Sequence, residues 1–262
     1  MPPHGRAGAP QRRRTHARTT PRKKDSRQPL QAMASNGTAD IPAEMAQYYK
    51  KGEESHAALK RMLADFDENT DTWKEEHRNA ESGAASFSKS FKGLGTGRQF
   101  IVVTDFGIDP AVLVPDLEKN IERQPEWDDT LKSCEVLHRI TEHCGFLYQV
   151  MADQPFISGR DILTIQFVSS TDDCWFFSGS SVEWEKKPPQ KGLVRAEAAL
   201  GGIRFRRTGP NSCNITYTLN CDFKGYLPKM AVNAKMSKET VRQMEMLRTH
   251  IEKTLKPRYN QA

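Results

Sequence analysis

Hydrophobic and polar residues follow two different periods along this chain, and the two periods predict its helices and strands. Towards the C-terminus, apolar residues recur every three or four positions, which places them on one face of a helix. This face consists of Val241, Met244, Leu247, Ile251 and Leu255. We predict one long amphipathic helix that starts near Pro228, because proline in a first helical turn loses no hydrogen bond.

Two other helices are predicted closer to the N-terminus. A partial apolar face with helical spacing runs from Ile41 to Phe66. A second helix is expected from Pro110 to Arg123, where Pro125 and Trp127 mark its end. The inner face of this second helix is formed by Val112, Leu113, Leu117 and Ile121.

Between the helices the pattern changes to segments rich in β-branched and aromatic residues, which are typical of strands. Three such segments precede the second helix, at 73–77, 84–91 and 98–104. Six follow it, at 133–140, 145–152, 161–169, 174–184, 192–207 and 214–222, and Gly201-Gly202 is expected to break the fifth of these. Their short spacing suits antiparallel hairpins, so we predict an α+β fold with an antiparallel sheet and helices from both ends of the chain.

The first 40 residues differ from the rest in composition. They are rich in Arg, Pro, Thr and Ser and poor in apolar residues, so we predict a disordered tail. The chain carries a formal net charge of +6, but residues 1–32 alone carry +8, which leaves −2 for the remainder. The folded part is therefore nearly neutral, and we expect no nucleic-acid partner. The tail is either a segment that targets mitochondria, the nucleus or acidic lipids, or a stretch without a role that precedes a start at Met33.

The five cysteines are Cys134, Cys144, Cys174, Cys213 and Cys221, an odd number without C-x-x-C spacing. We expect free thiols in a reducing compartment, and neither a metal nor another cofactor. No apolar run reaches the ~20 residues that a membrane-spanning helix needs, and no apolar segment typical of a secretory signal follows the basic N-terminus. We therefore expect a cytoplasmic monomer.

Candidate catalytic pairs fail on strand geometry. His143 and Cys144 are neighbours in the sequence, and neighbours in a strand point to opposite faces of the sheet. Cys134 and His138 share a face but lie about 13 Å apart at about 3.3 Å per residue. The sequence also contains no G-x-S-x-G, H-E-x-x-H or Walker motif, so we predict that the protein is not an enzyme.

Four short motifs follow one another along the chain. They are Pro125-Glu126-Trp127-Asp128, Gly159-Arg160-Asp161, the run from Gln190 to Glu197, and the run from Asp222 to Lys229 before the C-terminal helix. In this order they resemble the steroidogenic-acute-regulatory-protein-related lipid transfer (START) family over about residues 43–257, and the sterol-carrying members in particular. The resemblance implies a helix-grip fold, in which a curved antiparallel sheet wraps around the C-terminal helix and encloses an apolar cavity. The expected domains are a tail at 1–40, a lipid-binding domain at 41–257 and a short tail at 258–262.

The resemblance also implies which residues contact the lipid. Gln149 and Gln166 interrupt apolar strands and align with an acid and a base in the cavity of the sterol-carrying members. An amide suits a hydroxyl better than a phosphate, which would favour arginine, so we expect a sterol or another neutral lipid rather than a charged phospholipid. The alternative is that one or both amides face solvent. The expected lipid contacts are Gln149, Thr164, Gln166, Phe177, Asn220, Met244 and Leu247.

A closed cavity needs a gate, and we expect its hinge at Gly225 and Pro228, because hinges often lie at the ends of elements. By the resemblance, the opposite lip is the loop from Glu185 to Lys191, which includes Lys187 and Pro189. The lysines of this loop are expected to touch an anionic membrane, and an ordinary solvated loop is the alternative. Four charged residues are expected either to brace the sheet or to be solvated hairpin charges: Arg160, Asp161, Arg195 and Glu197.

Three functions follow from these patterns. The first is a lipid carrier that holds one lipid and moves it between membranes, including those of organelles. The second is a lipid-regulated enzyme or hydrolase on the same fold. The third is a lipid-sensing interaction protein whose basic tail binds acidic partners. The lack of a catalytic pair and the near-neutral folded part favour the first.

Overall fold

The computed structural model describes residues 41–91, 97–153, 158–225 and 229–259. The chain divides into two units, residues 1–31 and 32–262, and every described residue belongs to the second. The predicted tail at 1–40 therefore lies outside the described residues. At the other end, the structure remains helical up to Tyr259, two residues into the predicted C-terminal tail.

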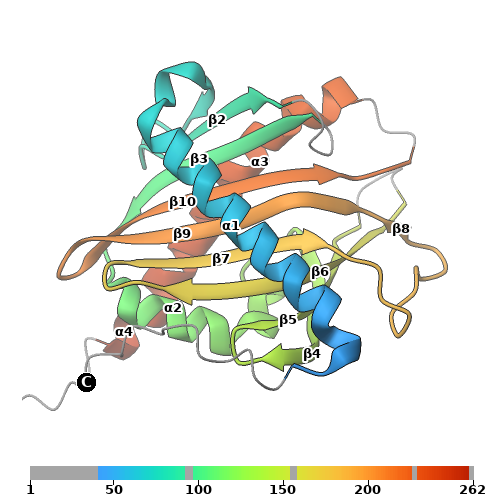
Figure 1. Cartoon of the computed structure of the whole chain (residues 1–262). Helices are drawn as coiled ribbons and strands as arrows, with labels where there is room; N and C mark the ends of the chain where they lie inside the picture. The colour runs from blue at the N-terminus through green and yellow to red at the C-terminus, as the bar shows by residue number, and fades with distance from the viewer. Residues whose placement is uncertain (1–40, 92–96, 154–157, 226–228, 260–262) are drawn as a thin grey trace, which may run out of the picture. The chain divides into compact units, whose positions relative to one another are not determined.

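All described strands join in one twisted sheet (Figure 1), in the order β1-β2-β3-β10-β9-β7-β6-β5-β4, with β8 beside β6 off this path. Their bounds are β1 Lys74–Arg78, β2 Ala85–Ser90, β3 Arg98–Phe106, β4 Leu131–Thr141, β5 Cys144–Met151, β6 Arg160–Ser170, β7 Cys174–Ser181, β8 Val194–Arg195, β9 Glu197–Gly209 and β10 Ser212–Asp222. Every pairing along the path is antiparallel, as predicted, and the short β8 adds one parallel pairing with β6.

The strand break expected at Gly201-Gly202 is wrong, because β9 runs through both glycines and the interruption falls at Ala196 instead. Gly202 allows α1 to approach the sheet closely. A side chain there would collide with the Phe177 carbonyl oxygen and would lie 2.6 Å from Leu59 Cδ2. A glycine inside a strand therefore marks the place where a helix packs tightly on the sheet.

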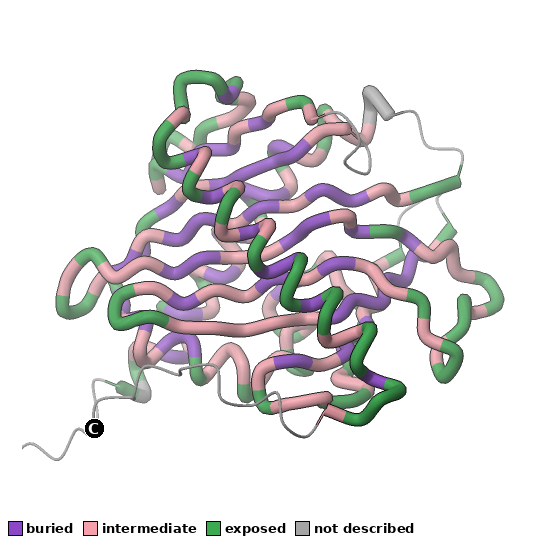
Figure 2. Tube along the Cα trace, viewed as in Figure 1, coloured by how far each residue is buried: buried purple, intermediate pink, exposed green. Residues whose placement is uncertain are grey.

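Helices cover both faces of the sheet (Figure 1). On one face the 3-10 turn η2 (Ala43–Met45) leads into α1 (Ala46–Glu68), which crosses several strands diagonally. Its buried residues have helical spacing and are Gly52, Ser55, His56, Leu59, Leu63 and Phe66. Figure 2 shows that the opposite side of α1 is exposed, whereas buried residues follow the central strands. A further 3-10 turn, η3 (Thr70–Thr72), connects α1 to β1.

The C-terminal helix lies on the other face of the sheet. It consists of α3 (Lys229–His250), a π-helical turn η5 (Ile251–Leu255) and α4 (Lys256–Tyr259). Pro257 has no N–H to donate to the preceding turn, which accounts for the widened π turn just before it. The five residues predicted to form the inner face of this helix are all at most 5% exposed, so that prediction is confirmed.

The second predicted helix ends earlier than expected. α2 (Pro110–Lys119) stops before Asn120, and the 3-10 turn η4 (Ile121–Glu126) follows it. Both the backbone N–H and the side-chain amide of Asn120 donate to the Asp116 carbonyl oxygen at 3.0 Å, which caps α2 at this point. Because α2 ends at Asn120, the chain changes direction there, and η4 lies along the edge of the cavity described below. Among the described helices, none combines the length and the apolar character needed to cross a bilayer.

Candidate functional site

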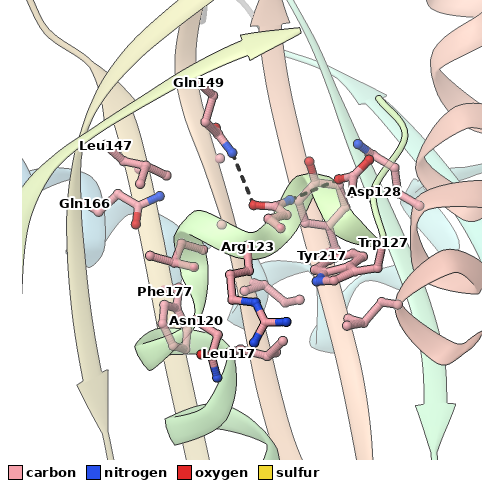
Figure 3. A pocket seen from close by; sticks show the side chains of 18 of the residues that line it. Leu117, Asn120, Arg123, Trp127, Asp128, Leu147, Gln149, Gln166, Phe177 and Tyr217 are labelled. Atoms are coloured by element: carbon pink, nitrogen blue, oxygen red, sulfur yellow. Dashed lines mark hydrogen bonds between the residues drawn. The ribbon is translucent and has the colours of Figure 1, made fainter. Parts of the chain in front are cut away.

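A cavity of about 260 Å³ lies between the sheet, η4 and the C-terminal half of the long helix (Figure 3). Its wall is largely apolar and includes Leu117, Ile121, Trp127, Leu147, Ile162, Phe177, Ile203, Phe205, Leu219, Met244, Leu247 and Leu255. Such an apolar wall suits the apolar body of a lipid.

Two glycines make room for the cavity in the middle of the sheet. Gly179 in β7 and Gly201 in β9 both line it and lie directly opposite each other in the two paired strands. A Cβ at Gly179 would meet only the side chains of Thr164 and Gln166, at 3.8 to 3.9 Å, so it would project into the cavity. A side chain at Gly179 would therefore take up part of this space, whereas a Cβ at Gly201 would already contact Leu219 Cδ1 at 3.4 Å.

The structure brings six of the seven expected lipid contacts together in the cavity wall. These are Gln149, Thr164, Gln166, Phe177, Met244 and Leu247. Asn220 is separated from them. It is fully buried on the other face of the sheet, where its side-chain amide donates to the Arg98 carbonyl oxygen at 2.7 Å. Leu219, its neighbour in β10, lines the cavity, and successive strand residues point to opposite faces.

The two glutamines differ in their surroundings. Gln149 Nε2 donates to Gln124 Oε1 at 3.3 Å, so one side of this amide is already engaged. The Gln166 side chain makes no hydrogen bond with the described part of the chain, and Figure 3 shows its amide at the cavity. A polar group in an apolar cavity needs a partner, so Gln166 favours a ligand with a polar atom.

Hydrogen bonds continue from Gln149 across the rim of the cavity to α3. Gln124 Nε2 donates to Asp128 Oδ2 at 3.0 Å, Thr130 Oγ1 donates to Asp128 Oδ1 at 2.5 Å, and Gln243 Nε2 donates to Thr130 Oγ1 at 3.1 Å. This chain of contacts, the rim network, joins β5, η4 and α3. Sequence reasoning missed it, although Asp128 stands in one of the motifs that indicated the family.

Tyr217 of β10 also lines the cavity and was missed as well. Burial, and then the negative charge of Asp128, raises the pKa of its hydroxyl well above the usual value, so the hydroxyl stays protonated. The rings of Trp127 and His250, which also line the cavity, stack with centroids 5.6 Å apart. Alternation in β10 was the available signal, because Tyr217 and Leu219 share one face.

Of the four charged residues expected to brace the sheet, Arg160 and Asp161 are buried and Arg195 is partly buried. The Asp161 carboxylate, 0% exposed, accepts bonds from Arg195 Nε and Nη2, both at 3.0 Å, and from the Tyr148 hydroxyl at 2.8 Å. Arg160 donates to the carbonyl oxygens of Phe223 and Lys224 at 3.3 Å. It therefore holds the segment that leads to α3.

Glu197, the fourth, is a surface charge. Its carboxylate is 60% exposed and pairs with Lys224 Nζ at 2.8 Å. Glu197 is therefore a solvated charge, which was the alternative expectation for these residues. The other three residues connect β6 to neighbouring segments.

The described residues of the expected gate do not line the cavity. Gly225 has a φ of +71°, which glycine adopts at no steric cost, and it precedes α3 as a sharp turn. Lys187 lies with Nζ 4.0 Å from the centroid of the Tyr148 ring, and Arg195 donates to the carbonyl oxygens of Lys187 and Pro188. Pro189 is exposed, and Pro228 lies outside the described residues. Whether this region opens remains a prediction.

A twisted antiparallel sheet with a long C-terminal helix and an apolar cavity between them defines a domain of the helix-grip type. The START domain family model matches residues 53–255, so the chain belongs to the START domain family. START domains bind lipid ligands, so this chain is a lipid-binding domain.

The chain is also similar to named proteins in sequence and to solved structures in fold. "Steroidogenic acute regulatory protein, mitochondrial" of Danio rerio is 27% identical over 198 residues, covering 74% of this chain and 67% of that protein. The protein of the same name from Bos taurus is 27% identical over 209 residues, covering 78% and 71%. The crystal structure of human STARD10 superimposes with a TM-score of 0.67 at 25% identity over 77% of this chain and 80% of that chain. Human StAR-related lipid transfer protein 5 superimposes with a TM-score of 0.68 at 17% identity over 79% and 98%.

Proposed function

We propose that the cavity holds one neutral lipid with a hydroxyl group, with sterols as the leading class, and that the protein carries this lipid between membranes without converting it. The observation that carries this proposal is the Gln166 amide, which lies at an apolar cavity without a partner among the described residues. A hydroxyl both donates and accepts, as an amide does, so the two groups match.

The wall of the cavity supports a neutral ligand, because it is largely apolar. Arg123 lines the cavity with an exposed guanidinium that pairs with the exposed Glu126 carboxylate through two contacts of 2.8 Å.

Titration with a fluorescent sterol tests the proposal. We expect saturation near one ligand per chain, and recovery of the unchanged sterol after prolonged incubation. Binding of charged phospholipids alone would contradict the proposed ligand class. Turnover of the bound lipid would instead favour an enzyme on the same fold.

Replacing both cavity amides, Gln149→Leu with Gln166→Leu, is expected to weaken sterol binding by about 1–3 kcal/mol, because the lipid hydroxyl then lacks a partner. This corresponds to a loss of about 5- to 150-fold in affinity, measured by the same titration. The substitutions keep the side chains near their original size, and circular dichroism checks folding. Unchanged affinity in a folded variant would show that the amides do not contact the ligand.

Membrane contact through the loop from Glu185 to Lys191 is the second part of the proposal. Lys186 and Lys191 are exposed, whereas Lys187 is partly covered by Tyr148. Replacing Lys186 and Lys191 with Gln is expected to slow transfer from anionic vesicles more than from neutral ones, because each lysine near such a surface contributes about 1 kcal/mol. Equal slowing from both kinds of vesicle would make this loop an ordinary solvated segment.

A further inference from the structure

Gln166 lies in a row of glycines that crosses the sheet. In β5 and β7, on either side of β6, the residues directly opposite it are Gly145 and Gly179. Gly179 in turn lies opposite Gly201 of β9. Directly opposite residues of paired strands share one face of a sheet, so no side chain stands beside Gln166 in this row.

The two flanks of Gln166 differ in the space that they offer. A Cβ at Gly145 would lie 2.8 Å from the His138 carbonyl oxygen, so the backbone of β4 already fills that place. The nearest atoms to a Cβ at Gly179 would be Cβ and Oγ1 of Thr164, both at 3.8 Å, and Gln166 Cγ at 3.9 Å. These are ordinary van der Waals distances, so the flank at Gly179 has room for one more methyl group.

This free space is part of the cavity and adjoins the polar group of Gln166. Thr164, Gln166 and Gly179 all line the cavity. Cγ of Gln166 is bonded to its amide carbon, so the space at Gly179, called the glycine recess below, is an immediate neighbour of the amide. A group in the glycine recess therefore lies beside whatever the amide binds.

A second cavity, of about 40 Å³, reaches Gln166 from the side of Gly145. Its lining includes the charged residues Glu118, Arg139 and Glu142. Water finds hydrogen-bond partners in such surroundings, whereas a methyl group finds none. The glycine recess is therefore the flank that suits an apolar branch of a ligand.

We propose that Gly179 determines the specificity of the cavity, and that the glycine recess receives a methyl group on the carbon next to the one that carries the lipid hydroxyl. The inference rests on the proposed function, in which Gln166 binds this hydroxyl. A hydroxyl at the amide brings the adjacent carbon of the ligand to the glycine recess. The ligand class is thus an alcohol that is branched beside its hydroxyl, and a sterol with a methyl group at carbon 4 is an example.

The expected selectivity follows from filling or blocking the glycine recess. A methyl group that moves from water into an apolar site raises affinity about fourfold, which corresponds to about 0.8 kcal/mol. In Gly179→Ala the new Cβ occupies the same place, so the branch of the ligand collides with it. Extra methyl groups in a packed site reduce stability or affinity, and we expect the preference to reverse.

The test compares three probes that compete with a fluorescent sterol. They are a 3-hydroxy sterol without a methyl group at carbon 4, its 4-methyl counterpart, and an isomer of this counterpart with the methyl group at carbon 14, far from the hydroxyl. Wild-type protein is expected to bind the 4-methyl probe about fourfold more tightly than the unmethylated one. Gly179→Ala is expected to bind the 4-methyl probe at least about fivefold more weakly than the unmethylated one, and to keep the wild-type ratio for the other two probes.

Gly201→Ala is the matched control, because it adds the same methyl group on the facing strand. The nearest neighbours of this Cβ would belong to Leu219, Thr218 and Gly179 rather than to Gln166. The substitution is therefore expected to weaken all three probes to a similar extent and to keep their order. Neither glycine has a positive φ, so alanine fits the backbone at both positions.

Two results would overturn the inference. One is wild-type protein that binds the 4-methyl probe no more tightly than the unmethylated one, a measurement that needs no variant. The other is an equal change of this ratio in the two alanine variants, since total cavity volume rather than the place beside Gln166 would then decide. Failure of wild-type protein to bind any of the probes would instead reject the proposed function.

Discussion

Asp161→Asn is expected to lower the free energy of unfolding by about 3–5 kcal/mol, the usual cost of removing one partner of a buried ion pair. The substitution leaves Arg195, 19% exposed, without the carboxylate that both its Nε and its Nη2 contact at 3.0 Å. It also weakens the acceptor of the Tyr148 hydroxyl. Urea unfolding at neutral pH, followed by tryptophan fluorescence, measures the change.

Glu197→Gln is the control for this experiment, because it removes a similar charge from the surface pair with Lys224. Exposed pairs contribute about 0–1 kcal/mol, so a shift within that range is expected. A similar loss of stability in both variants would mean that charge itself, rather than burial with hydrogen bonds, determines the effect.

Lowering the pH from 7 to about 4 is expected to destabilise the protein through His56 by about 3 kcal/mol. His56 is 6% exposed between α1 and the sheet, and burial, followed by the charge of Lys60, lowers its pKa from 6.5 to about 4. The unfolded chain binds a proton below pH 6.5, whereas the folded chain does so only near pH 4. The stabilisation is therefore complete above pH 6.5 and is lost as the pH falls towards 4.

The hydrogen bonds of His56 indicate its neutral form. Ser178 Oγ donates to the Phe167 carbonyl oxygen at 3.2 Å, so it accepts from His56 Nδ1 at 2.9 Å. His56 Nε2 then accepts from the Ser169 hydroxyl at 2.7 Å.

Carboxyl groups also titrate between pH 7 and 4, so the contribution of His56 has to be measured by comparison. Urea unfolding of wild-type protein and of His56→Gln over this pH range gives the difference in stability that is due to His56. We expect the difference in stability between the two proteins to shrink as the pH falls. His138→Gln, at an exposed position of β4, is the control and should leave the pH dependence as in the wild type. A constant difference between wild type and His56→Gln across this range would contradict the assignment.

Local patterns alone predicted most of the elements. The inner face of the C-terminal helix and the antiparallel strands follow from spacing of three to four residues and from β-branched segments, and both depend only on near neighbours in the chain. The end of α2 was misplaced by a few residues, because the cap at Asn120 depends on one side-chain hydrogen bond that spacing does not reveal.

The sequence by itself determined that this protein has a START-type sheet with an amphipathic C-terminal helix, and that two amides interrupt apolar strands. It did not determine which face of β10 turns to the cavity, so Asn220 was expected to contact the lipid, whereas its neighbour Leu219 lines the cavity. Only the tertiary structure decided which face of the sheet turns to the cavity, that Gly202 lets α1 pack closely on the sheet, and that Asp128 and Tyr217 both line the cavity. The physical reason is that periodicity records contacts within one element, whereas a cavity is formed by side chains from segments that are distant in the chain and close only after folding.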